Sequence, residues 1–310
     1  MLALAKQAVR TASRLPQHQS RERCEAWACY ANALRVCNRF REAREAFRQA
    51  WAAFEQVGDP LLAARLHELE ASLYEATGEF RDADLSLEKS LLIRLGQPDD
   101  GAAIGACFVK RANVAGHAGD WAAAIRYLRA ALDYPARDAG TAFAVVHNLA
   151  WFLVDAGEPD LALTVILEHS AVAPPPSGPT LLRSRWLSAR ILAAMTRADC
   201  SVASLELSAI RDEFLALGLP FDAALAGLEA LSLQAAPDPS ALAALHQIFE
   251  ALGVEREALA AQLLLDAAQN ERLDILVPRI VEALKGLAAM GKLNLRQALP
   301  VRVDRSAALP

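Results

Sequence analysis

Residues 21–54 have the sequence RERCEAWACYANALRVCNRFREAREAFRQAWAAF. In this stretch Ala31 is followed by Ala43, Phe47 and Ala50, at spacings of twelve, four and three residues. Alanine is the best helix former, and few residues here are β-branched. Asn38 lies between the two halves, and asparagine is one of the residues that end a helix in a left-handed conformation. The stretch therefore predicts two helices joined by a short turn.

The same pattern of small and bulky residues recurs four more times along the chain. Its leading residues, from Ala31 to Ala189, lie 40, 41, 38 and 39 positions apart. The further copies are Ala71, Ala83, Leu87 and Ser90; Ala112, Ala124, Leu128 and Ala131; Ala150, Ala162, Ile166 and His169; and a degenerate fifth, Ala189, Ser201, Leu205 and Ser208. A fixed period of this length is typical of a solenoid, in which each unit contacts only its neighbours.

Composition agrees with a helical solenoid. The chain has 310 residues, of which 54% are hydrophobic, and alanine and leucine dominate, so disorder is excluded for most of it. The net charge of −5 argues against nucleic acid as a partner. Residues 1–57 nevertheless carry a charge of +5. That basic end is either a solvated surface with Glu–Arg pairs, such as those among Glu42, Glu45 and Arg48, or a docking surface for an acidic partner or nucleic acid.

We therefore predict one all-α domain over residues 1–290, a solenoid of helix–turn–helix repeats. The repeats are expected at residues 21–58, 61–98, 102–135, 140–170, 180–217 and 221–252. Capping helices are expected over 255–290 and a flexible tail over 291–310, and Ala173–Pro179 should be a stiff proline-rich linker between the fourth and fifth repeats.

The repeat resembles the tetratricopeptide repeat (TPR). Trp27, Ala31, Phe40, Ala43 and Ala50 match the motif in residues 21–54, and AGDWAAAIRYLRAALDYP at 118–135 is similar to its second half. The resemblance covers roughly residues 21–210 and extends more loosely to 290, and it implies that the solenoid is a right-handed superhelix. The family's usual period is 34 residues, whereas this one is close to 40, as in long bacterial repeat proteins of regulatory systems. The excess of arginine over lysine also suggests a bacterial source.

Motifs of catalysis and cofactor binding are absent from the sequence. It contains no GxxxxGK[ST], GxGxxG, HExxH, GxSxG or CxxC, and its six histidines are not spaced as metal ligands. We expect no enzyme activity, no cofactor and no metal. The five cysteines lack disulfide-like spacing, and no signal peptide or long apolar segment is present, so we predict a cytoplasmic protein without a membrane partner.

The resemblance implies a binding groove, because the first helix of each TPR faces the concave surface. The residues expected to line this groove are Asn113, His147, Asn148, Trp151, Arg183, Trp186 and Arg190, with Asn32, Arg35 and Glu68 as secondary contacts. Asparagine amides can bind a peptide backbone, arginines a carboxylate, and tryptophans can anchor a partner. The alternative is that Trp151 and Trp186 are core residues and the asparagines satisfy loop carbonyls.

Part of this set also resembles the carboxylate clamp with which some TPRs hold a peptide C-terminus. Asn113, Asn148 and Arg190 match it, but Val109 and Trp186 stand where the two clamp lysines would be. Terminal-carboxylate binding and general peptide binding both stay open.

The functional prediction is a non-enzymatic scaffold or adaptor whose concave groove binds another protein or a peptide. Two alternatives are a peptide-sensing regulatory subunit of a bacterial signalling or transcription-control system and a structural subunit of a larger complex. The sequence leaves open the partner, the pathway and the oligomeric state, including a homo-oligomer.

Overall fold

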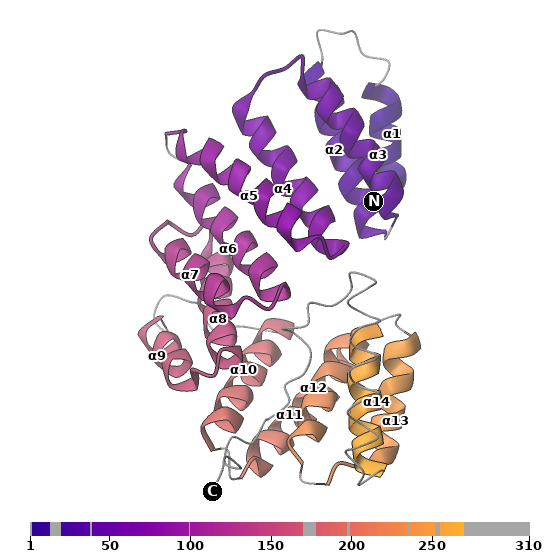
Figure 1. The fold of residues 1–310 in the computed structure, drawn as a ribbon, viewed down its shortest axis with the longest axis vertical. Helices are drawn as coiled ribbons and strands as arrows, with labels where there is room; N and C mark the ends of the chain where they lie inside the picture. Colours follow the sequence, from indigo (N-terminus) through magenta and orange to yellow (C-terminus); the bar gives the residue numbers. More distant parts are fainter. Residues whose placement is uncertain are drawn as a thin grey trace, which may run out of the picture. The chain divides into compact units, whose positions relative to one another are not determined.

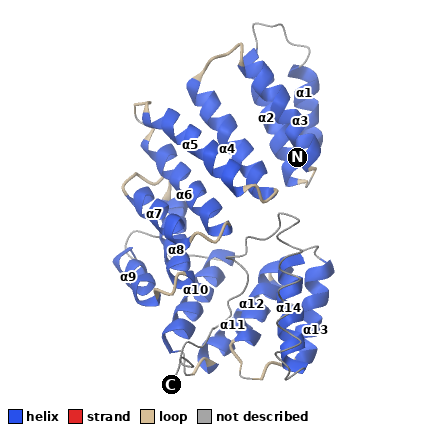
Figure 2. Cartoon of the chain, viewed as in Figure 1, coloured by secondary structure: helices blue, strands red, loops and turns tan. Residues whose placement is uncertain are grey.

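The computed structural model describes residues 2–12, 20–37, 39–98, 100–169, 178–196, 199–234, 236–251 and 255–269 of the chain. Within these ranges every regular element is an α-helix, and there are fourteen (Figures 1 and 2). The all-α prediction is therefore confirmed. The helix expected over 273–290, the tail over 291–310 and most of the proline-rich linker lie outside the described residues.

The chain divides into two compact units, residues 1–174 and residues 175–310, called here the N-terminal and C-terminal units. The N-terminal unit contains α1 (Leu2–Ala12), α2 (Ser20–Val36), α3 (Phe40–Phe54), α4 (Pro60–Ala76), α5 (Phe80–Leu95), α6 (Gly101–His117), α7 (Trp121–Leu132), α8 (Ala139–Asp155) and α9 (Pro159–His169). The C-terminal unit contains α10 (Pro179–Thr196), α11 (Ser201–Ala216), α12 (Pro220–Ser232), α13 (Pro239–Ala251) and α14 (Glu255–Gln269).

Four helical hairpins form the N-terminal unit: α2–α3, α4–α5, α6–α7 and α8–α9. The last three close with the same turn, in which a glycine with positive φ ends the first helix: Gly78 (78°), Gly119 (76°) and Gly157 (83°). The N–H of the next residue donates to a carbonyl five residues back, as from Asp120 to Ala115 at 2.8 Å. This pairing satisfies carbonyls at the helix end that would otherwise lack a partner. Each hairpin then packs on the next.

The repeated small residues lie where the two helices of a hairpin meet. In the first four copies the leading alanine and the alanine twelve positions later are at most 2% exposed. The bulky residues Phe47, Leu87 and Leu128 are at most 1% exposed and pack in the same places. A buried alanine brings the two backbones close, and the bulky side chain fills the space beside it. The predicted hairpin packing is confirmed for these copies.

The fifth copy of the pattern is out of phase with the structure. Leu205 is 72% exposed, and α11 instead buries Ala203, Leu207, Ile210 and Phe214. The reason is that α11 pairs with α12 and is the first helix of a hairpin, so the second-helix positions of the pattern do not apply to it.

The repeated turn reappears one helix later, between α11 and α12. Gly218 has a φ of 71°, and Leu219 N–H donates to Phe214 O at 3.0 Å. The hairpins of the C-terminal unit are accordingly α11–α12 and α13–α14, while α10 packs on α11 ahead of them. This differs from the expected repeats at 180–217 and 221–252, which would have paired α10 with α11 and α12 with α13.

In the α11–α12 hairpin the large residue of the contact between the two helices is on the first helix and the small one on the second, the reverse of the other hairpins. Counted from its turn glycine, Arg211 stands at the position of Ala71 and Ala112, and Gly227 at the position of Leu87 and Leu128. A Cβ atom added at Gly227 would lie 3.1 Å from Arg211 Cδ. The aliphatic part of the arginine side chain therefore occupies the space that a bulky residue of the second helix fills in the other hairpins. As a result the residue pattern of the repeat is not recognisable in this hairpin.

This exchange predicts that substitutions at the two positions have non-additive effects on stability. Gly227→Leu should crowd the arginine stem, whereas Arg211→Ala should leave space, so the double variant should regain the usual arrangement. We expect its free energy of unfolding, measured in urea, to exceed by about 1 kcal/mol or more the value obtained by adding the two single effects. Purely additive effects would contradict the exchange.

A second prediction concerns the contact between α6 and α8. A Cβ atom at Gly116 would lie 2.4 Å from Phe152 Cε1, so Phe152 requires glycine there. Gly116→Ala should therefore destabilise the protein by about 1–3 kcal/mol, even though alanine favours a helix more than glycine does. Gly140→Ala at the exposed start of α8 is the matched control, and there thermal unfolding should occur at the same temperature or slightly higher.

Candidate functional site

Side-chain contacts connect the first helices of successive hairpins in the N-terminal unit. Glu68 of α4 binds Lys110 of α6, and Glu75 of α4 lies 2.8 Å from His117 Nδ1 of α6. Between α6 and α8, Asn148 Nδ2 donates to Asn113 Oδ1 at 3.2 Å. We call these three contacts the interhelix row. The partners lie 42, 42 and 35 residues apart, close to one repeat, so the row runs from hairpin to hairpin.

Asn113 and Asn148, predicted as groove residues, are thus brought together. Both are half-buried. Among the described residues Asn113 Nδ2 has no partner, and the nearest donor to Asn148 Oδ1, His147 Nδ1, is at 3.5 Å, which is too far for a strong hydrogen bond. The pair keeps one amide donor and one carbonyl acceptor for a further group.

The predicted residues His147 and Trp151 form an aromatic stripe on α8 together with Phe143. The rings of Phe143 and His147 have centroids 5.6 Å apart, and those of His147 and Trp151 are 5.9 Å apart. All three are half-buried and stand one helical turn apart. Sequence reasoning selected two of them and missed Phe143, although the four-residue spacing could have indicated it.

The remaining primary residues belong to α10 of the C-terminal unit, where each contacts α12. Arg183 binds Asp222 at 3.0 Å and Arg190 binds Glu229 at 2.6 Å, while Trp186 Nε1 donates to Glu229 as well. Trp186 is 7% exposed and packs edge-on against Phe214. These contacts hold α10 on the following hairpin. Because these residues and Asn113 lie in different units, their convergence on one groove stays a prediction.

The secondary residues are held within the N-terminal unit. Arg35 Nε donates to Asn32 Oδ1 at 3.0 Å on α2. The side chain of Glu68 is 13% exposed and accepts from Arg94 Nε at 2.7 Å, from Ser90 Oγ at 3.0 Å and from Lys110. Arg94 also binds Asp100 at 2.8 Å. Glu68 is therefore the centre of an ionic cluster between α4, α5 and α6, and sequence spacing gave no sign of this cluster.

The charges of this cluster determine the titration of Glu68. Burial alone would raise the pKa of its carboxyl, but Lys110 and Arg94 outweigh that effect and hold the pKa below its usual value. For Arg94, burial lowers the pKa of the guanidinium, whereas Glu68 and Asp100 raise it, and the net shift is upward. Both groups stay ionised at neutral pH.

A second buried ion pair joins α5 to α6. Arg111 is 8% exposed and binds both carboxylate oxygens of Asp84, at 2.7 and 2.9 Å. Its guanidinium lies 4.5 Å from the ring centroid of Tyr127 on α7. Such two-pronged pairs fix geometry as well as supplying energy.

The basic N-terminal end shows the paired arrangement. Arg39 binds Glu42 at 2.6 Å and Arg48 binds Glu45, all on the exposed side of α3. These are local Glu–Arg pairs of the kind expected in the first of the two alternatives, the solvated surface.

In the described part of the chain, no group of three or more His, Cys, Asp or Glu side chains is placed to hold a metal ion. None of the described helices is long and apolar enough to cross a membrane. All five cysteines are free thiols, and burial raises the pKa of Cys24 and Cys107 to about 11, which keeps both protonated.

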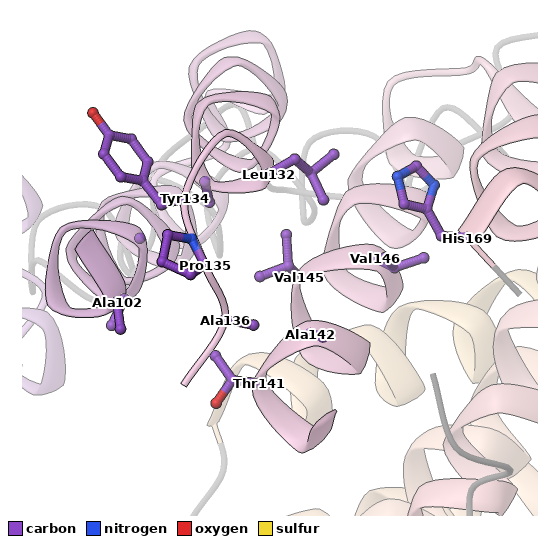
Figure 3. Close-up of a pocket in the computed structure, with 13 residues that line it drawn as sticks. Ala102, Leu132, Tyr134, Pro135, Ala136, Thr141, Ala142, Val145, Val146 and His169 are labelled. Atoms are coloured by element: carbon purple, nitrogen blue, oxygen red, sulfur yellow. The ribbon is translucent and has the colours of Figure 1, made fainter. Parts of the chain in front are cut away.

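One cavity of about 220 Å³, partly open to solvent, lies between α6, α7, α8 and the end of α9 (Figure 3). Its walls come from the helix ends remote from the hairpin turns and are mostly apolar, including Ala102, Leu132, Pro135, Val145 and Val146. His169 lies at one end of it, across from Ala102 and Pro135 in the view of Figure 3. Sequence reasoning did not select this region.

No protein-family model matches the chain, and no curated protein matches its sequence. The tetratricopeptide-repeat resemblance thus rests on the repeated residues themselves.

The ionic cluster predicts how the stability of the protein changes at acidic pH. Because the pKa of Glu68 is lower in the folded state than in the unfolded chain, its contribution to stability is present above the unfolded pKa of about 4.5 and is lost as the pH falls through the folded value. Glu68→Gln should cost about 2 kcal/mol at pH 7, since it leaves Arg94 and Lys110 without this carboxylate. In urea unfolding the difference from wild type should shrink between about pH 5 and pH 3. A difference that is constant with pH would contradict the charge argument.

Proposed function

We propose that this chain is a tetratricopeptide-like right-handed α-solenoid that acts as a non-enzymatic scaffold or adaptor, binding a protein or peptide along the face formed by its first helices. The repeated hairpins, their glycine turns and their buried alanines support this proposal. Stacked hairpins present an extended surface of the kind that such proteins use for binding.

The Asn113–Asn148 pair is the observation that carries the proposal. An extended peptide offers N–H and C=O groups alternately along its backbone. Asn148 already donates to Asn113 at 3.2 Å, which orients both amides and leaves the Asn113 N–H groups and the Asn148 carbonyl for a ligand. Two fixed amides of adjacent hairpins are therefore suited to bind the N–H and the C=O of one residue, which point to the same side of an extended peptide. The stripe of Phe143, His147 and Trp151 on α8 would supply apolar contact for a neighbouring side chain.

The arginines of α10 are less suited to a ligand carboxylate. Arg190 is bound to Glu229 and Arg183 to Asp222, so a peptide C-terminus would have to displace an internal carboxylate. We therefore assign backbone recognition to the asparagines and place less weight on a carboxylate clamp.

A second candidate function is that of a structural subunit that binds through a second helix. The exposed side of α5 carries Leu85, Leu92 and Leu95, which are 47%, 65% and 51% exposed. Their spacing of seven and three residues places them along one side of the helix. A peptide-sensing regulatory subunit in the cytoplasm would use the same asparagine face, with an output carried by a partner.

Binding of a peptide selected from a random-sequence phage library tests the proposal. Asn113→Ala/Asn148→Ala should weaken binding about tenfold or more, because two hydrogen bonds worth about 0.5–1.5 kcal/mol each are lost. Affinity is measured by fluorescence polarisation, and circular dichroism checks that helicity is unchanged. The matched variant Leu85→Ser/Leu92→Ser should bind like wild type.

The two double variants separate the candidates. Equal affinity of wild type and the asparagine variant would overturn binding by the first-helix face. Loss of binding only in the leucine variant would instead support the structural-subunit function.

A further inference from the structure

The cavity beside His169 lies where the hairpin α6–α7 meets α8 (Figure 3). The repeat makes it possible to compare this junction with the equivalent place between α2–α3 and α4. Ala50 and Ala131 occupy the same repeat position, so Leu132 corresponds to Trp51 and Pro135 to Phe54. In the same way Val146, four residues before Ala150, corresponds to His67, four residues before Ala71.

At that first junction aromatic rings fill the space. The Trp51 ring lies against His67, with centroids 4.7 Å apart, and contacts Phe54 edge-on at 5.5 Å. At the middle junction the place of Phe54 is taken by Arg94, which Glu68 and Asp100 hold. At the third junction the corresponding side chains are the smaller Leu132, Pro135 and Val146, and all three line the cavity. The cavity therefore lies where the first repeat places an indole ring.

His169 gives this cavity a polar end. It stands at the repeat position occupied by Ala50 and Ala131, so a large polar side chain replaces a small one. His169 Nδ1 lies 2.9 Å from Val165 O. A carbonyl can only accept, so in the neutral imidazole the proton is on Nδ1 and Nε2 carries the lone pair. Nε2 has no partner among the described residues and can accept one hydrogen bond.

We propose that this cavity binds one small, neutral aromatic molecule of about the size of indole, which donates a hydrogen bond to His169 Nε2. The volume allows this, because an apolar cavity of about 150 Å³ holds one benzene molecule and this one has about 220 Å³. The apolar walls disfavour a charged ligand, whose desolvation they could not offset. The occupant is a free molecule and not a protein side chain. The site uses neither Asn113 nor Asn148, so it stands apart from the peptide-binding proposal.

Titration of the full chain with indole tests this site, with binding measured by isothermal titration calorimetry and by ligand-observed NMR. We expect saturable binding of one indole per chain. Leu132→Trp should weaken it at least tenfold, because its ring would enter the cavity as Trp51 enters the first junction. Leu205→Trp places the same side chain on the 72%-exposed position of α11 and should bind indole like wild type. Circular dichroism and thermal unfolding check that both variants fold.

The hydrogen bond has its own test. His169→Phe keeps a ring of similar size but removes the acceptor, so indole should bind about three- to tenfold more weakly. Indene, which lacks the N–H group, should bind wild type and this variant equally. Equal loss of indole and indene would overturn the role of Nε2.

Three outcomes would overturn the site itself. The first is the absence of saturable indole binding up to millimolar concentration. The second is equal binding by the Leu132→Trp and Leu205→Trp variants. The third is binding of N-acetyltryptophanamide or tryptophan-containing peptides without binding of indole, which would assign the cavity to a protein side chain.

Discussion

The close approach of two helices at buried alanines is the constraint on which the rest of this structure depends. Ala43 and its equivalents Ala83, Ala124 and Ala162 are completely buried. At these positions a larger side chain would push the helices apart, and the bulky residue one turn later would lose its place. Arg211 and Gly227 show that the constraint is on the pair and not on either residue, since a small second-helix residue accommodates a large first-helix one. In each hairpin the side chains at the contact between the two helices are therefore complementary in size.

Polar contacts then join one hairpin to the next. Arg111 binds Asp84 across α5 and α6, and Glu68 gathers Arg94 and Lys110 between three helices. Burying such charges costs desolvation, so they favour one arrangement of neighbours more than they add stability. In a chain whose units contact only their neighbours, this choice is made separately at every junction.

The junctions consequently differ in what they offer to a ligand. The first is filled by Trp51 and Phe54, the middle one contains the Arg94 cluster, and the third contains a cavity next to His169. On the first helices, the interhelix row uses Glu68 and Glu75 internally but leaves polar atoms of Asn113 and Asn148 for another group. The two binding sites that we propose thus differ by a few side chains of one repeated hairpin.

The helices, the period and the first four hairpins could be predicted from the sequence, because alanine spacing and turn glycines act within about 40 residues of chain. The contact between Asn113 and Asn148 could be predicted as well, since residues one repeat apart become neighbours when hairpins stack. The pairing of α11 with α12 could not be predicted, because the Arg211–Gly227 exchange keeps the packing while erasing the pattern. The Glu68 cluster and the cavity were equally hidden, because both depend on which side chains meet across hairpins, and spacing along the chain does not record how well those side chains fill the space.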